Sequence, residues 1–283
     1  MQNIKYVVVR IDRIGMNLYC IINAIYYCKK HNLEYVHVPL DDSYIEYTKL
    51  FKLGEEYKTM SKEKYYLETN DTTNDTTNDT TNNITNLARL FSLIKNNELH
   101  KKSIINYKSL HFEEYRNVLI NKYTNSELYI QMFKRNEINI CIHYRRGDVQ
   151  LLKKQMYKHI KKRVRLRYNL RYTPDNFINN IITKLNVNMS GLPLNIHIHS
   201  DIILDLDKLI TVKHNFKICP HFDDSPIEAL NSMIQCDILF RYGISAFSGV
   251  AAFYNENIVI SNIQKKYKYL YNFSNTYMFE KCD

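Results

Sequence analysis

The sequence contains no tryptophan, and glycine and proline are scarce, with 6 and 5 copies in 283 residues. Each glycine in a turn is therefore more informative than usual. No two of the 6 cysteines have the CxxC spacing of a zinc site or redox motif, which favours reduced, buried thiols and a reducing compartment. The N-terminal apolar run is too short for a signal peptide or membrane anchor, so we expect a cytoplasmic or otherwise soluble protein, or a fragment of a longer one.

Hydrophobic side chains and positive charge are both abundant. Hydrophobic residues make up 45% of the chain, enough for the core of one large domain or two modest ones. The formal net charge of +10 favours anionic partners. Nucleic acids, anionic membranes and phosphorylated small molecules all belong to that class, so the charge does not choose among them.

The first forty residues have the pattern of an α/β unit. Residues 4–9 predict a buried strand, 12–17 a glycine-bearing turn, 18–30 a helix and 34–38 a second strand. Strand, turn, helix and strand in this order open a Rossmann-like unit.

A second α/β unit is expected in the other half of the chain. Strands are predicted at 138–142, 194–199, 237–240 and 258–260, and helices at 177–185, 226–235 and 247–254. Pro174 is expected at the first helical position of the helix over 177–185. Residues 84–133 look mostly helical. Two Rossmann-like units facing a cleft account for this pattern, and a single merged domain is the alternative.

Asn-Asp-Thr-Thr recurs through residues 70–82, which contain no apolar side chain. Such a tract cannot pack into a core. We therefore predict a disordered insert over residues 68–84.

Two consecutive arginines, Arg145 and Arg146, follow a buried strand. Ligands of open α/β sheets bind beyond the carboxyl ends of strands, and the planar guanidinium of arginine can bind two phosphate oxygens at once. Gly147 permits a tight turn, and Asp148 is placed to orient a guanidinium. An ordinary surface pair of arginine and aspartate remains the alternative.

These residues belong to the segment IHYRRGDV, which resembles the His-x-Arg-Arg-x-Asp motif of α-1,2-, α-1,6- and protein O-fucosyltransferases. Residues 13–18 (RIGMNL) resemble the N-terminal Gly-x-Gly-Asn-Gln segment of the α-1,2 group. Residues 228–252 are similar to the late segment of the family, in which a helix, an Ala-Asp-Ile-Leu-Val strand and a Ser-Ser-Phe-Ser turn follow one another. Ser200 and Asp201 match a weaker element.

The resemblance implies an α/β protein of GT-B architecture. Its N-terminal acceptor-side domain would span residues 1–135 and its nucleotide-sugar-binding domain residues 136–283. It implies an inverting glycosyltransferase that moves fucose from GDP-fucose to a glycan or glycoprotein acceptor, with neither a metal nor a cofactor. Nucleic acid is not expected as a partner.

The resemblance also assigns roles to residues. Arg145 should contact the β-phosphate with support from Arg146 and Asp148, and Asn17 should lie near the acceptor hydroxyl. The predicted catalytic residues are Arg145, Asn17 and Asp148. The predicted donor-binding residues are His143, Arg145, Arg146, Gly147, Ser245, Phe247, Ser248, Asp201, Glu228 and Gly15.

Two positions depart from the family pattern. Ala229 stands where many members carry an aspartate thought to read guanine, and the adjacent Glu228 is the candidate to replace it. The family turn Ser-Ser-Phe-Ser loses one hydroxyl at Ala246. Ser245 and Ser248 can face a phosphate at a helix start, and simple N-capping, worth about 1 kcal/mol, is compatible with that role.

Other polar groups have simpler interpretations. Asp205 and Asp207 form a DxD sequence, which we interpret as a helix start. His197 and His199 share one face of a strand; we expect them to line a core or cleft, because no third metal ligand is evident. The basic run over 153–171 is usually a solvated face. It also supports a rival function, a non-catalytic transferase-derived binding protein or a nucleic-acid binder.

Overall fold

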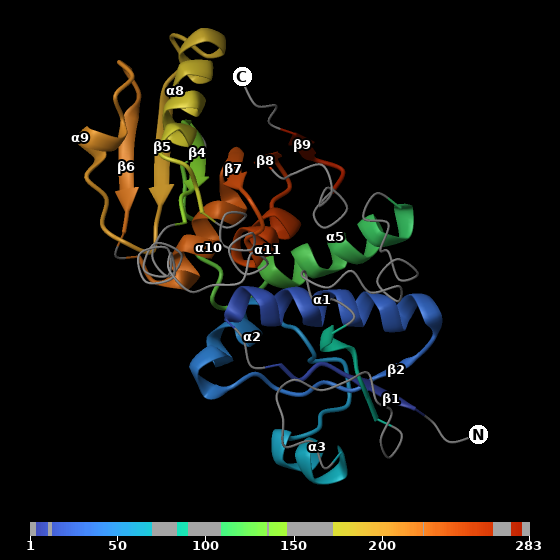
Figure 1. The fold of residues 1–283 in the computed structure, drawn as a ribbon. Helices are drawn as coiled ribbons and strands as arrows, with labels where there is room; N and C mark the ends of the chain where they lie inside the picture. The colour runs from blue at the N-terminus through green and yellow to red at the C-terminus, as the bar shows by residue number, and fades with distance from the viewer. Residues whose placement is uncertain are drawn as a thin grey trace. The chain divides into compact units, whose positions relative to one another are not determined.

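The computed structural model describes residues 4–10, 13–69, 84–89, 109–134, 136–145, 172–222, 224–262 and 273–278. The chain divides into two compact units, Met1–Tyr129 and Ile130–Asp283. Each contains helices and a sheet of parallel strands, so the predicted α/β class is confirmed (Figure 1). Within the described part, no helix combines the length and apolar character needed to cross a membrane.

The first unit has a three-stranded parallel sheet in the order β2-β1-β3. Its strands are β1 (Lys5–Val7), β2 (Glu34–Tyr35) and β3 (Ile84–Asn86). Its helices are α1 (Ile14–His31), η1 (Asp42–Tyr44), α2 (Ile45–Phe51), α3 (Lys62–Thr69), η2 (Leu87–Arg89) and α5 (Leu110–Thr124). The predicted strand and helix order at the start of the chain is present, with shorter strands than the sequence suggested.

Helix α1 begins earlier than its sequence pattern indicates. The turn predicted over residues 12–17 is wrong from Ile14 onward, because Gly15 and Asn17 lie inside the first helical turn. Burial explains the difference: α1 is buried continuously from Ile14 to Tyr26, so packing against the rest of the unit outweighs weak local helix propensity. The helix ends at Asn32, whose left-handed backbone caps it.

The helical prediction for residues 84–133 is wrong at its start. Ile84–Asn86 form strand β3, which pairs with β1. The side chain of Asn86 extends this pairing, because it accepts a hydrogen bond from the Val9 amide at 3.2 Å and donates one to the Val9 carbonyl at 3.0 Å. The prediction is confirmed for α5 and wrong for residues 125–133, which are turns and irregular chain; residues 90–108 lie outside the described part.

The insert predicted over residues 68–84 is wrong at both ends. Residues 68 and 69 close helix α3, and residue 84 opens strand β3. Residues 70–83, which contain the repeated Asn-Asp-Thr-Thr tract, lie outside the described part of the chain.

The second unit contains a six-stranded parallel sheet in the order β6-β5-β4-β7-β8-β9. The strands are β4 (Ile138–His143), β5 (Leu194–His199), β6 (Lys217–His221), β7 (Ile238–Tyr242), β8 (Ile258–Asn262) and β9 (Thr276–Met278). From β4 the chain winds outward through β5 and β6, then returns to β7 on the other side of β4. This reversal makes the β4–β7 boundary the topological switch point, where α/β sheets bind ligands.

The helices of the second unit are α8 (Asn176–Asn188), α9 (Leu206–Leu209), α10 (Pro226–Gln235) and α11 (Ala246–Tyr254). The predicted strands and helices of this unit are confirmed, and β6 and β9 are additional. Pro174 was misplaced, because α8 begins at Asn176 and the proline precedes it. The helix-start interpretation of Asp205 is confirmed, since its carboxylate accepts a hydrogen bond from the Lys208 amide at 3.3 Å.

The two faces of the six-stranded sheet differ in chemistry. The isoleucines that alternate along β4 and β5 are buried in a hydrophobic core with α8, which lies along these strands in Figure 1. The alternate positions point to the opposite face. There Cys141 and His199 contact Ser232 of α10. One face is thus an aliphatic core, and the other carries polar groups.

Candidate functional site

A row of polar side chains crosses the six-stranded sheet near the carboxyl ends of its strands. The residues paired in register from β6 to β8 are His221, His199, His143, Arg241 and Ser261. Residues in register on parallel strands point to the same face. All of them except His221 are buried. This row therefore places buried histidine, arginine and hydroxyl groups at the edge where ligands bind.

His143 ends β4 at the switch point. It is buried, and its Nδ1 has no hydrogen-bond partner among the described residues. Burial and the positive charge of Arg145 lower the pKa of His143 to about 3, although Asp201 opposes the shift. The ring is therefore neutral at pH 7. It lies 6.0 Å from the ring of Phe247, between centroids, and its free nitrogen is available to a ligand.

Arg145 is held at the end of β4 by the segment that precedes α8. Its amide donates to Thr173 Oγ1 at 3.2 Å, and the Thr173 amide donates to the Arg145 carbonyl at 3.3 Å. The neighbouring Tyr144 is buried, and its hydroxyl donates to Asp175 at 3.0 Å. These contacts anchor the backbone of Arg145, whose side-chain charge acts on His143.

The turn between β7 and α11 presents two buried serines. Ser245 and Ser248 are 1% and 0% exposed, and neither hydroxyl has a hydrogen-bond partner among the described residues. Ser245 occupies the N-cap position of α11 without a side-chain capping bond, so the N-capping interpretation of Ser245 is wrong. Buried hydroxyls are normally satisfied, and helix N-termini attract anions. The start of α11 therefore has the chemistry of an anion site.

Arg241 is a site residue that the sequence analysis did not single out. It is fully buried on β7, and its Nη2 donates to the Ser245 carbonyl at 3.2 Å. Gly243, with φ at 63°, allows the chain to turn back between these two residues. The available signal was the single charged residue inside the apolar strand Ile238–Tyr242. Arg241 holds the turn that carries Ser245 and adds positive charge beside His143.

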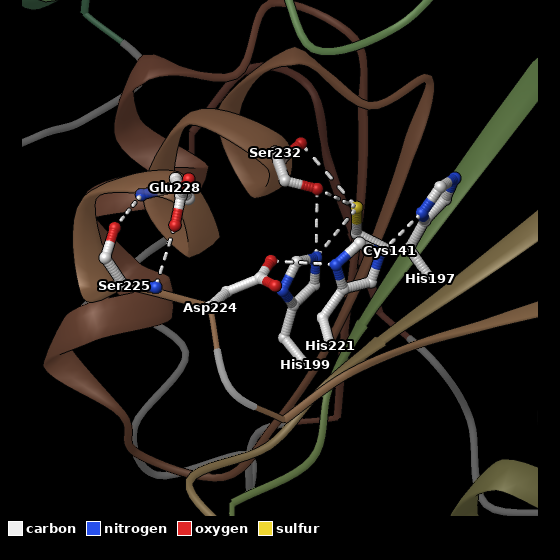
Figure 2. Close-up of polar contacts among 8 residues, drawn as sticks. All are labelled: Cys141, His197, His199, His221, Asp224, Ser225, Glu228 and Ser232. Carbon is white, nitrogen blue, oxygen red and sulfur yellow. Dashed lines mark hydrogen bonds and ion pairs between the residues drawn. The ribbon is translucent and has the colours of Figure 1, made fainter.

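Two predicted donor-binding residues are exposed, one just after β5 and one in the first turn of α10. Asp201 is exposed just after β5, and its charge acts on His143. Glu228 is exposed in the first turn of α10, where it forms a capping box with Ser225 (Figure 2). Its carboxylate accepts from the Ser225 amide at 2.9 Å, and Ser225 Oγ accepts from the Glu228 amide at 3.2 Å. Glu228 thus has a structural contact, and its role toward the donor stays a prediction.

Replacing Glu228 with alanine is expected to destabilise the protein by about 1 kcal/mol, because an N-terminal capping contact of α10 is lost. Urea denaturation followed by circular dichroism measures this loss. GDP affinity, measured on the same variant, separates the two roles of Glu228. Unchanged affinity leaves only the structural role, whereas a clear loss supports the predicted contact with the donor.

The remaining predicted residues belong to the first unit or lie outside the described part of the chain. Gly15 and Asn17 are buried in α1 of the first unit. Arg146, Gly147 and Asp148 lie outside the described part of the chain, as does the basic run over 153–171. Their assigned roles stay predictions.

No protein-family model matches the chain, and no curated protein matches it either. Among solved structures, POFUT1 in complex with GDP-fucose is similar, with 8% identity, a TM-score of 0.47, and coverage of 92% of this chain and 97% of that one. The E. coli heptosyltransferase WaaC with ADP matches with 8% identity, a TM-score of 0.46, and coverage of 97% and 92%. The fucosyltransferase NodZ from Bradyrhizobium matches with 11% identity, a TM-score of 0.37, and coverage of 89% and 93%.

These three neighbours are all glycosyltransferases. Their identities and TM-scores are low, so a functional conclusion for this chain has to rest on its own residues. The groups at the end of β4 and the start of α11 provide that basis.

Proposed function

We propose that this protein is an inverting glycosyltransferase of GT-B architecture that transfers fucose from GDP-fucose to a glycan or glycoprotein acceptor. The transfer step, as proposed, uses arginine and helix amides in place of a metal. The main support is the pair of buried hydroxyls of Ser245 and Ser248 at the N-terminus of α11, for which the described residues provide no hydrogen-bond partner. They follow strand β7, which pairs with β4, the strand that ends at His143 and leads to Arg145.

Sugar transfer from a nucleotide leaves a diphosphate, and negative charge grows on the leaving oxygen as its bond to the sugar breaks. Arg145 is placed to stabilise this charge through paired hydrogen bonds. The amides at the start of α11 and the hydroxyls of Ser245 and Ser248 add donors that are already oriented. Because His143 is neutral, its Nδ1 can contact the nucleoside without adding charge.

The acceptor hydroxyl attacks the anomeric carbon from the face opposite the diphosphate, which inverts the configuration. A bond from the acceptor oxygen to that carbon forms as the bond to the phosphate oxygen breaks, and the hydroxyl proton passes to a base. The acceptor side is assigned to the first unit, where Asn17 is the residue that the family resemblance places near this hydroxyl.

A nucleotide panel tests the proposal without knowledge of the acceptor. We expect GDP and GDP-fucose to raise the thermal unfolding midpoint more than UDP or ADP, and the protein to hydrolyse GDP-fucose slowly. The double substitution Ser245→Ala/Ser248→Ala should weaken GDP binding about 100-fold or more, since two hydrogen bonds to a charged group are lost, each worth about 1.5 kcal/mol or more. Ser190→Ala, at an exposed turn position, is the matched control and should bind as the wild type.

Two results would contradict the proposal. One is stabilisation by short oligonucleotides but by none of the nucleotides, which supports the rival nucleic-acid binder. The other is equal GDP affinity in the wild type and the double serine variant, which removes the start of α11 from the donor site.

A further inference from the structure

Two histidines of the polar row, one on β5 and one on β6, lie close to an aspartate in the turn after β6. His199 ends β5, His221 ends β6, and Asp224 precedes α10. One possible ligand atom from each lies within 4.8 Å of the others. Figure 2 shows the Asp224 carboxylate beside the two rings. We call these three residues the histidine cluster. The sequence analysis found no third ligand for His197 and His199, because β6 and the turn after it contributed no pattern.

His199 has one nitrogen engaged and one available. Its Nε2 lies 2.9 Å from Ser232 Oγ. The Cys141 thiol donates its proton to the Ser232 carbonyl, so its sulfur can accept a hydrogen bond from the Ser232 hydroxyl. The oxygen of that hydroxyl then accepts a hydrogen bond from His199 Nε2. His199 Nδ1 has no hydrogen-bond partner among the described residues, and the side chain is 2% exposed. A buried nitrogen lone pair without a partner is costly to keep.

The tautomer of His221 follows from the residues behind it. Asn139 donates through Nδ2 to the Glu137 carbonyl, so its Oδ1 accepts from His197 Nε2 at 3.2 Å. A neutral His197 therefore accepts at Nδ1, and His221 Nε2 donates to it at 2.9 Å. His221 Nδ1 is left facing Asp224 at 2.7 Å.

We propose that His199, His221 and Asp224 bind one divalent first-row transition metal ion, with Zn²⁺ as the reference ion. The ligands are Nδ1 of each histidine and a carboxylate oxygen of Asp224. Two imidazoles and one carboxylate suit Zn²⁺ and its first-row neighbours. Mg²⁺ and Ca²⁺ prefer sites made of oxygen ligands, so neither is expected to compete.

A small rearrangement brings the ligands to bonding distance. Tetrahedral Zn²⁺ with bonds of about 2.0–2.1 Å places its ligand atoms about 3.3 Å apart. The two rings are stacked with centroids 4.5 Å apart and planes at 19°, so one ring must turn to share an ion with the other. The side chains of His221 and Asp224 are 22% and 28% exposed, so they can move and an ion can enter beside them. His χ2 is a soft torsion.

The ion has a structural consequence that does not rest on the proposed sugar transfer. It links the ends of β5 and β6 to the turn that starts α10. Three protein ligands leave the fourth tetrahedral position open to water or another ligand. The proposal assigns the ion no part in the transfer step, so its failure and the failure of the GDP test are separate results.

The test is a competition titration of full-length, chelator-stripped protein with Zn²⁺ against a chromophoric chelator, with Co²⁺ absorption reporting the ligand field. We expect one high-affinity equivalent for the wild type. Asp224→Asn and His221→Gln should lower its affinity by more than the roughly 10- to 100-fold that loss of an outer-shell partner costs. Asp205→Asn and His214→Gln, which remove the same groups outside the cluster, should bind as the wild type.

Thermal unfolding provides a second readout. Zn²⁺ should raise the unfolding midpoint of the wild type and leave that of Asp224→Asn unchanged. Circular dichroism of the stripped proteins checks that each variant is folded, and Asp224→Asn alone decides the test if His221→Gln does not fold. Equal Zn²⁺ affinity in the wild type and Asp224→Asn overturns the proposal, as does a wild type that does not compete with the chelator.

Discussion

The substitution Arg145→Ala is expected to lower the rate of donor hydrolysis and of sugar transfer by about 100-fold or more. Loss of a single donor that stabilises a developing oxyanion costs about 10²–10³ in rate in other enzymes. The fold should survive, because the substitution keeps the two contacts between the backbone of this residue and Thr173. Steady-state hydrolysis of GDP-fucose, together with the thermal unfolding midpoint, measures both effects.

Two controls sharpen this prediction. Arg145→Lys keeps the positive charge but loses the planar pair of donors, so it should recover only part of the activity. Lys208→Ala removes a charge whose side chain is 86% exposed and should leave hydrolysis unchanged. An Arg145→Ala protein with wild-type hydrolysis would refute the role of this guanidinium in the leaving-group step.

The substitution Gly54→Ala is expected to lower the free energy of unfolding by about 3 kcal/mol or more, through backbone strain and overpacking. Gly54 has φ at +89°, which a side-chain-bearing residue rarely adopts. A Cβ at this position would lie 2.3 Å from Cγ of His37. His37 is buried and its Nδ1 lies 3.3 Å from the Tyr35 hydroxyl, so the ring cannot move away freely.

Gly191→Ala is the matched control for this clash. Gly191 has φ at +86°, but nothing lies within 4 Å of a Cβ built there, so only the backbone strain is added. Chemical denaturation of the two variants should therefore show a clearly larger loss for Gly54→Ala. Equal losses would mean that the His37 ring adapts and that the close contact contributes little.

The strands and helices of the second unit were predictable because each shows its own periodicity. Isoleucine recurs at every second position along Ile138–His143 and Leu194–His199. This alternation predicts each strand, and which residues share a face, from neighbouring residues alone. The start of α1 and strand β3 were not predictable in this way. The first depends on burial of weak helix formers, and the second on pairing of Asn86 with Val9, 77 residues away.

The candidate site was predictable in part. The motif order pointed to Arg145, His143 and the start of α11 as one ligand site, and the sheet order places their strands next to each other. Arg241 was missed because one charged residue in a short apolar strand does not by itself indicate which groups it contacts. The absence of a capping bond from Ser245 within the described part also required the folded geometry.

The sequence alone determined the alternation of strands and helices, the shared strand face of His197 and His199, and the position of Arg145 after a buried strand. Those features depend on neighbours within a few residues along the chain. Tertiary structure alone decided the register that aligns His221, His199, His143 and Arg241 in one row, and the approach of Asp224 to two histidines. Asp224 and His221 are only three residues apart, but the other contacts join segments separated by long connections, whose path local side-chain preferences do not specify.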